Sequence, residues 1–194
     1  MTDSTAPAHL PASATPAGDG VVMGEGLVTV DVYIDFLCPF CRQFELSSGE
    51  ALATMVADGL ISLVYHPMNF LDEASTTRYS SRAAASAGCA SDGGRFAEYA
   101  RALFVSQPPE GGSGLSDAEL IQLGLSVGLP GHAFGECVRR GAYLAWPPYV
   151  TAMATARGVS ATPTVLVDGV FVPANARMIA AEVAAAADAA GPAV

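Results

Sequence analysis

Two cysteines three positions apart carry the clearest chemical signal in this sequence. Cys38 and Cys41 enclose Pro39 and Phe40, and the motif follows an apolar run that ends at Leu37. On the first turn of a helix, cysteines at this spacing have Cα atoms about 5 to 6 Å apart, a separation that a disulfide accepts. The motif therefore predicts a redox-active dithiol, whose chemistry needs no cofactor besides its two sulfur atoms.

The residues of the motif also predict which sulfur reacts first. Proline is favoured at the first position of a helix, where a backbone N–H would have no partner, so Pro39 makes Cys38 the expected N-cap. A sulfur there lies among free N–H groups at the positive end of the helix dipole, which lowers the pKa of the thiol below roughly 8.5. We expect Cys38 to be the nucleophile and Cys41, one turn deeper, to be the buried thiol that resolves a mixed disulfide.

A metal site and a chance pair of structural cysteines are the two alternatives for this motif. Half of a zinc site would need a second closely spaced pair of ligands. The remaining cysteines, Cys89 and Cys137, lie far apart in the sequence and have no adjacent histidine. The spacing therefore favours the redox pair, and no metal is expected.

Other polar residues give weaker signals. His66 follows an apolar strand and is expected to be a surface or hydrogen-bonded residue, not a catalytic one. Neither His9 nor His132 is expected to form a triad with a nucleophilic serine, because His9 lies in the predicted tail and His132 at the start of a predicted helix. Asp35, three residues before Cys38, is either a solvated loop charge or a group that tunes the thiol, and the sequence favours neither.

The composition narrows the class of protein. At 194 residues the chain is long enough for one domain with an insertion, and its 51% hydrophobic content is that of a globular protein. All nine basic residues are arginines, against 19 acidic residues, so no basic stripe is available to bind nucleic acid. No apolar stretch reaches the ~18 residues of a membrane helix, so we expect no membrane span.

The first 24 residues differ in composition from the rest. They are rich in Ala, Pro, Ser, Thr and Gly and show almost no apolar periodicity, so we expect a disordered tail over 1–24. They lack the basic and apolar regions of a signal peptide, so the chain as written is expected to be cytoplasmic. An extracytoplasmic location is the alternative, because similar Ala/Pro-rich tracts are linkers that follow a removed membrane anchor.

Strand and helix patterns surround the cysteine motif. β-Branched and aromatic residues over 27–36 predict a buried strand, and a helix is expected from Pro39 to about Asp58. A second apolar strand is predicted over 61–65, before Pro67. Strand, helix and strand in this order form a right-handed unit with parallel strands.

Residues 74–157 are expected to be helical almost throughout. The spacing from Phe96 to Phe104 places apolar side chains on one helix face, and Ser116 with Glu119 forms a capping-box pattern. Further helices are predicted over 131–140 and 142–157.

Two short strands and a last helix follow. The segments 164–167 and 170–172 flank Asp168-Gly169, a pair typical of a two-residue type I′ hairpin turn. Asn175 is the expected N-cap of the last helix. The inward face of that helix is expected to contain Met178, Ile179, Val183 and Ala186.

This order of elements predicts an α/β protein with a thioredoxin fold. A βαβ half and a ββα half would share one mixed sheet, with an all-helical subdomain inserted between them. The expected divisions are a disordered tail (1–24), the first half of the thioredoxin domain (25–70), the helical insertion (71–157), the second half (158–190) and a short tail (191–194).

On these residues the chain resembles the DsbA-like branch of the thioredoxin superfamily. The resemblance covers roughly Val28 to Ala187, and its motifs are Asp35–Cys41, Gly158–Thr164 and the helical insertion between them. It implies a protein disulfide oxidoreductase in which Cys38 attacks or is attacked and Cys41 resolves the mixed disulfide.

The resemblance also implies where substrate binds. Pro163 would be a cis-proline beside the two cysteines, and Thr162 would offer its backbone N–H and C=O to an extended substrate strand. Pro39 and Phe40 would belong to an apolar substrate groove. The implied partners are unfolded or extended polypeptides and a redox partner that recycles the dithiol.

A second disulfide is a further implication of the resemblance. Some similar actinobacterial proteins carry one between helices of the insertion, and Cys89 and Cys137 occupy similar positions. Two unrelated buried thiols are the alternative, since free cysteine packs as a small apolar residue. A reducing cytosol would disfavour the bond.

The chain departs from the family pattern at two positions. Val32 stands six residues before the first cysteine, where many thioredoxin-like enzymes carry a buried acid, so proton transfer must use water or another group. Phe40 replaces the histidine of well-known DsbA oxidants, so we expect a less extreme oxidant. A cytosolic reductase or isomerase of the same fold and a noncatalytic thioredoxin-like binding module remain as alternatives.

Overall fold

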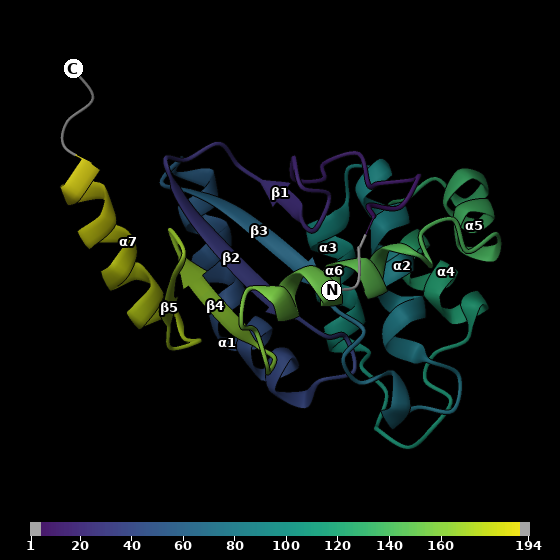
Figure 1. Ribbon diagram of the computed structural model, residues 1–194. Helices are drawn as coiled ribbons and strands as arrows, with labels where there is room; N and C mark the ends of the chain where they lie inside the picture. The colour runs from purple at the N-terminus through teal and green to yellow at the C-terminus, as the bar shows by residue number, and fades with distance from the viewer. Residues whose placement is uncertain (1–4, 191–194) are drawn as a thin grey trace.

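A five-stranded mixed sheet forms the centre of the protein (Figure 1). The computed structural model describes residues 5–190. Strands follow the order β1-β3-β2-β4-β5 across the sheet. The bounds are β1 Val21–Met23, β2 Val28–Ile34, β3 Ile61–Pro67, β4 Thr164–Val167 and β5 Val170–Val172. Because β2 pairs parallel with β3 and antiparallel with β4, the strand that leads into the cysteine motif is central and supported on both sides.

Helices cover both faces of this sheet and form a separate group beyond one end of it. They are α1 Pro39–Ala57, α2 Tyr79–Asp92, α3 Phe96–Val105, α4 Asp117–Ser126, α5 Gly131–Arg139, α6 Trp146–Ala156 and α7 Ala176–Ala190, with a short 3-10 helix at Asp72–Ala74. In Figure 1, α1 lies behind the sheet, α6 crosses in front of it, and α2 to α5 gather at the end opposite α7. α7 packs against α1 and β4, and α6 packs against β3 and α2.

The predicted fold class is confirmed. A βαβ unit comes first, a block of helices follows, and a ββα unit completes the sheet. Asp168 and Gly169 have φ values of 45° and 81°, as the predicted type I′ turn between β4 and β5 requires. The capping box of Ser116 and Glu119 is present at the start of α4.

The prediction of a disordered tail is wrong for residues 5–24. Val21–Met23 forms β1 at the edge of the sheet, antiparallel to β3. The segment before it is fixed by contacts with α6, since the Trp146 indole donates to the Gly18 carbonyl at 2.8 Å. Composition gave no sign of this order, because the stabilising partners come from distant parts of the chain. The rest of the predicted tail, 1–4, and the predicted tail at 191–194 lie outside the described residues.

Two local predictions also need correction. α6 begins at Trp146 and not at Ala142, with proline in its first turn. Pro147 and Pro148 could not donate the backbone hydrogen bonds that a helix starting at Ala142 would require of them. In α7, Ile179 is buried as predicted, whereas Met178 is 44% exposed because it lies on the solvent side of the helix.

Candidate active site

Cys38 lies between the central strand and the first helix. β2 ends at Ile34, a short turn follows, and Cys38 is the N-cap of α1 with Pro39 at the first helical position. Cys38 is 4% exposed, and Cys41, one turn into the helix, is fully buried. Both carry free thiols. Both cysteines therefore lie below the surface, and Cys41 is the more deeply buried of the two.

The loop before β4 approaches the same point from the other side of β2. Antiparallel pairing of β2 with β4 sets Thr164 opposite Tyr33, so the residues before Thr164 lie beside the turn after β2. The Thr162–Pro163 peptide bond is cis. The Cys38 thiol donates to the Thr162 carbonyl at 3.3 Å. Residues 124 positions apart are therefore in direct contact at the reactive sulfur.

The surroundings of the two thiols shift their pKa values in opposite directions. A hydrogen bond with Cys41 lowers the pKa of Cys38 to about 6, with help from the backbone N–H groups of Phe40 and Cys41 and against the effect of burial. Burial raises the pKa of Cys41 well above its ordinary range. These shifts favour the thiolate of Cys38 above about pH 6 and the protonated thiol of Cys41.

Asp35 is a fully buried carboxylic acid, so its interpretation as a solvated loop charge is wrong. Its Oδ1 accepts hydrogen bonds from the Leu37 N–H at 2.8 Å and the Ser80 hydroxyl at 2.7 Å. Its Oδ2 accepts from the Leu71 N–H at 2.8 Å. Burial raises the pKa of Asp35 to about 6 despite these bonds. This side chain joins the turn before Cys38 to α2 and to the segment after β3.

Gln107 is a second side chain that holds the same turn. Its Nε2 donates to the carbonyl oxygens of Phe36 and Cys38, at 2.9 and 3.0 Å. Gln107 follows α3 and belongs to the helical insertion. Nothing in the sequence singles it out, since it is an isolated glutamine in an irregular segment.

A second buried acid lies on α1 one turn beyond Cys41. Glu45 is 7% exposed, its Oε2 accepts from the Tyr65 hydroxyl at 2.9 Å, and burial raises its pKa. It borders a cavity of about 390 Å³ between α1, α3 and the sheet, and the basic side chain that lines this cavity is that of Arg101. Glu45 was not predicted, although its position four residues after Cys41 places both residues on the same side of α1.

An apolar surface adjoins the cysteines. Pro39 is exposed and the Phe40 side chain is 69% exposed, so both are open to solvent beside Cys38. A shallow hollow of about 380 Å³ lies next to them, lined by Pro39, Arg42, Gln43, Leu46 and Ser47. Leu46 is 47% exposed, so the hollow offers apolar surface to a partner.

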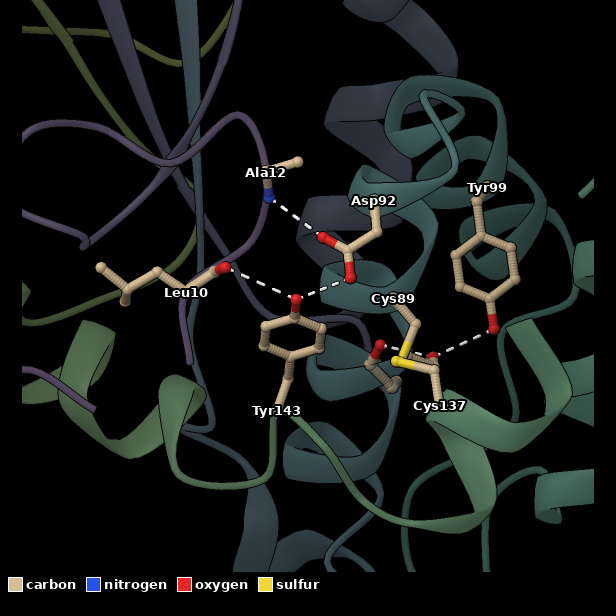
Figure 2. The surroundings of a disulfide bond; sticks show 9 residues. Leu10, Ala12, Cys89, Asp92, Tyr99, Cys137 and Tyr143 are labelled. Atoms are coloured by element: carbon tan, nitrogen blue, oxygen red, sulfur yellow. Dashed lines mark hydrogen bonds between the residues drawn. A yellow bond between two sulfur atoms is a disulfide. The ribbon is translucent and has the colours of Figure 1, made fainter. Parts of the chain in front are cut away.

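The other two cysteines form a disulfide away from this motif (Figure 2). Cys89 on α2 and Cys137 on α5 are bonded at 2.06 Å. Figure 2 shows Tyr143 nearby, whose hydroxyl donates to Asp92 at 2.6 Å and lies 3.4 Å from the Leu10 carbonyl. The bond therefore joins two helices of the insertion, as the resemblance implies.

The remaining candidates lie apart from the cysteine motif. His66 is buried, with Nδ1 at 2.7 Å from the Asp19 carbonyl and Nε2 at 2.8 Å from Asp31, so it is a hydrogen-bonded residue of the sheet. His9 and His132 belong to the N-terminal segment and to α5. Within residues 5–190, no group of three or more His, Cys, Asp or Glu side chains is arranged to hold a metal ion.

Comparison with curated proteins gives partial matches. Serine/threonine-protein kinase PknE from Mycobacterium tuberculosis and Mycobacterium bovis is 37% identical to this chain over 135 residues. The match covers 65% of this chain and 24% of the kinase. The chain thus spans about a quarter of the length of these relatives. No helix of residues 5–190 combines the length and apolar character that a membrane crossing needs.

Solved structures match over nearly the whole chain. DsbA from Mycobacterium tuberculosis, in its reduced form, is 32% identical with a TM-score of 0.75, covering 89% of this chain and 93% of that one. Reduced DsbG, a disulfide bond oxidoreductase from the same organism, is 34% identical with a TM-score of 0.76, covering 92% and 90%. A family model described as thioredoxin matches residues 17–186. The chain belongs to the thioredoxin family, in the DsbA-like branch that these two structures represent.

Proposed function

We propose that this protein is a thiol-disulfide oxidoreductase that exchanges disulfides with polypeptides through Cys38. One observation carries the proposal: the Cys38 sulfur, with its pKa lowered to about 6, contacts the Thr162 carbonyl in front of a buried Cys41 whose pKa is raised. A low pKa makes Cys38 both a thiolate at neutral pH and a good leaving group. Cys41 then forms the internal disulfide with Cys38 and leaves as the free thiol when a substrate attacks that disulfide.

Oxidation of a substrate dithiol takes two thiol-disulfide exchanges. A substrate thiolate attacks the Cys38 sulfur of the Cys38–Cys41 disulfide, and the electron pair of the broken bond leaves on Cys41, which takes up a proton. A second substrate thiolate then attacks the substrate sulfur of the mixed disulfide, and Cys38 leaves as a thiolate. The substrate loses two electrons and the protein gains them. A redox partner must remove these electrons before the next cycle.

Substrate binding follows from the surfaces on both sides of Cys38. Phe40 and Pro39 offer apolar contact next to the sulfur. An extended strand placed against Thr162 could pair with its backbone and bring a substrate cysteine to Cys38. An unfolded or extended polypeptide fits this arrangement better than a folded one, because it can present a free strand edge.

The Cys89–Cys137 disulfide supports a place outside the cytoplasm. Structural disulfides persist in oxidising compartments and are rare where glutathione and thioredoxin keep thiols reduced. The extracytoplasmic alternative is therefore our proposal for location, and net oxidation of substrates is our proposal for direction. The reduction potential of the Cys38/Cys41 pair, measured against glutathione, tests the direction.

Turnover of a two-cysteine peptide in glutathione buffer tests the proposed activity. Wild-type protein should accelerate disulfide formation in the peptide, and Cys38→Ser should abolish the effect. Cys41→Ser should accumulate a mixed disulfide with a disulfide-bearing peptide, because the resolving thiol is missing. Equal trapping by Cys38→Ser would reverse the two roles. A wild-type protein that binds the peptide without turnover would be a noncatalytic binding module.

A further inference from the structure

One side-chain amide of the helical insertion donates two hydrogen bonds to the turn that carries Cys38. Gln107 uses both N–H bonds of its Nε2, one to the carbonyl of Phe36 at 2.9 Å and one to the carbonyl of Cys38 at 3.0 Å. A side-chain amide has only two such bonds to donate. Both N–H groups of the amide therefore donate to the residues that flank Leu37, immediately before the helix.

A side chain of α1 also donates in the opposite direction, to the helical insertion. The Arg42 guanidinium on the first turn of α1 donates from Nε to the Phe104 carbonyl at 3.1 Å, near the end of α3. The rings of Phe36 and Phe104 also contact each other, with centroids 5.1 Å apart. Phe36, Arg42, Phe104 and Gln107 thus form a four-residue link, which we name the α1–α3 clamp. It fixes the start of α1 to the end of α3.

The α1–α3 clamp affects the reactive sulfur through a hydrogen bond to the Cys38 backbone. The Cys38 carbonyl accepts from Gln107 and also from the Arg42 backbone N–H, at 3.2 Å. These bonds hold Cys38 in its extended N-cap conformation, with φ -70° and ψ 118°. In that conformation the sulfur lies near the N–H groups of Phe40 and Cys41, which stabilise its thiolate.

We propose that Gln107 is a positioning residue for disulfide exchange, through which the helical insertion sets the reactivity of Cys38. The proposal rests on the proposed thiol-disulfide exchange and extends it by assigning a task to the insertion. Gln107 does not touch substrate in this assignment. It favours the thiolate, and so the dithiol form of the Cys38/Cys41 pair, over the disulfide form.

Isosteric substitution separates this role from simple packing. Gln107→Met keeps the length and apolar stem of the side chain and removes both donors. Gln107→Glu keeps the shape and replaces the donors with a charge that faces two carbonyl oxygens. Gln122 on α4 is exposed, so Gln122→Met and Gln122→Glu are matched controls. Each full-length variant is compared in three measurements: Cys38 thiolate absorbance against pH, the equilibrium constant with glutathione, and thermal melting in both redox forms.

We expect Gln107→Met to lower the acid ionisation constant of Cys38 by about threefold to tenfold, on the scale of a single hydrogen bond, because the two lost bonds go to backbone carbonyls and act on the sulfur only through the Cys38 conformation. The glutathione equilibrium should move toward the protein disulfide in the same sense. Gln107→Glu should give a larger change of the same sign, and the Gln122 variants should match wild type within twofold.

Two results would overturn the assignment, and a third concerns the activity on which it rests. If both Gln107 variants melt earlier by the same amount in the two redox forms while the ionisation and glutathione constants stay within twofold of wild type, Gln107 is only a packing residue. A shift of either constant in the opposite direction would also contradict the proposal. If wild-type protein itself exchanges no disulfide with glutathione, the proposed oxidoreductase activity fails, whatever the Gln107 variants do.

Discussion

At the scale of residues, the site depends on an asymmetry between two identical side chains. Cys38 and Cys41 share one helical turn, but only Cys38 lies at the end where backbone N–H groups are free. The thiolate gains these dipoles together with a hydrogen bond from its neighbour, and the neighbour is left buried and protonated. The same three-residue spacing therefore assigns opposite roles to the two sulfurs.

The hydrogen bond between the thiols can be tested by substitution at Cys41. Cys41→Ala removes the donor, whereas Cys41→Ser keeps a hydroxyl in its place. A hydrogen bond to a charged group contributes about 1.5 to 3 kcal/mol, so Cys41→Ala should raise the pKa of Cys38 by about one to two units. Cys41→Ser should raise it less. Thiolate absorbance against pH measures both, and equal pKa values in the two variants would contradict the role of the bond.

Asp35 gives a prediction for stability against pH. Its folded pKa is about 6 against an ordinary 3.8, so the folded protein keeps a proton that the unfolded chain releases between about pH 4 and 6. The contribution of Asp35 to stability is full below about pH 4 and is lost as pH rises through about 6. At 1.36 kcal/mol per pKa unit, the loss is roughly 3 kcal/mol for this buried group.

Asp35→Asn should remove this slope, even though it lowers the overall stability by disturbing three hydrogen bonds. Urea denaturation of the Cys38–Cys41 disulfide form from pH 4 to pH 7 gives the comparison, because Cys38 does not titrate there. If the free energies of unfolding of wild type and Asp35→Asn change by the same amount from pH 4 to pH 7, the assignment of the raised pKa is contradicted.

The sequence predicted the reactive pair because the information is local. The spacing of Cys38 and Cys41, together with Pro39, defines a helix N-terminus within four residues. The partners of Asp35 and Gln107 lie 45 and 71 positions away, at Ser80 and Phe36. No periodicity or capping rule connects such positions, so their roles follow only from the packed structure.

At the scale of elements, the disulfide stabilises the insertion that holds Gln107. Cys89 and Cys137 join α2 to α5 and close a loop with a sequence separation of 48. α2 also packs against α3, α4 and α6. The bond thus connects one end of the helical block to the helix around which the block is built.

Replacement of both cysteines, Cys89→Ala with Cys137→Ala, should lower the free energy of unfolding by about 4 kcal/mol in the chain-entropy estimate for a loop of this length. The pKa of Cys38 should stay at its wild-type value, because the α1–α3 clamp does not contain either residue. Urea unfolding and thiolate titration of the double variant measure the two quantities. Free thiols at both positions in wild-type protein kept from reductants would contradict the bond itself.

At the scale of the whole molecule, the strands around the cysteine motif were predictable and the N-terminal segment was not. Apolar strand patterns at 27–36 and 61–65 and the hairpin at Asp168-Gly169 are each recognisable alone, and the βαβ rule then makes the first two of these strands parallel. Residues 5–24 lack such a pattern. Their order comes from β3, whose edge pairs with Val21–Met23, and from aromatic side chains of α6.

Trp146 is a fully buried attachment point of the N-terminal segment. Its indole N–H donates to the buried Gly18 carbonyl at 2.8 Å. Trp146→Phe keeps an aromatic ring and leaves that carbonyl without its donor, which costs about 1 to 3 kcal/mol.

Because the lost bond belongs to the segment before β1, hydrogen exchange of the Val21–Met23 amides should become faster, whereas exchange in β2 should change little. Tyr149→Phe is the matched control, since the Tyr149 hydroxyl donates to the neighbouring Ala17 carbonyl at 2.7 Å in an exposed position. Water can replace that bond, so exchange in β1 should stay close to wild type. Equal acceleration in β1 and β2 of Trp146→Phe would mean that the indole stabilises the whole fold instead of attaching the N-terminal segment to it.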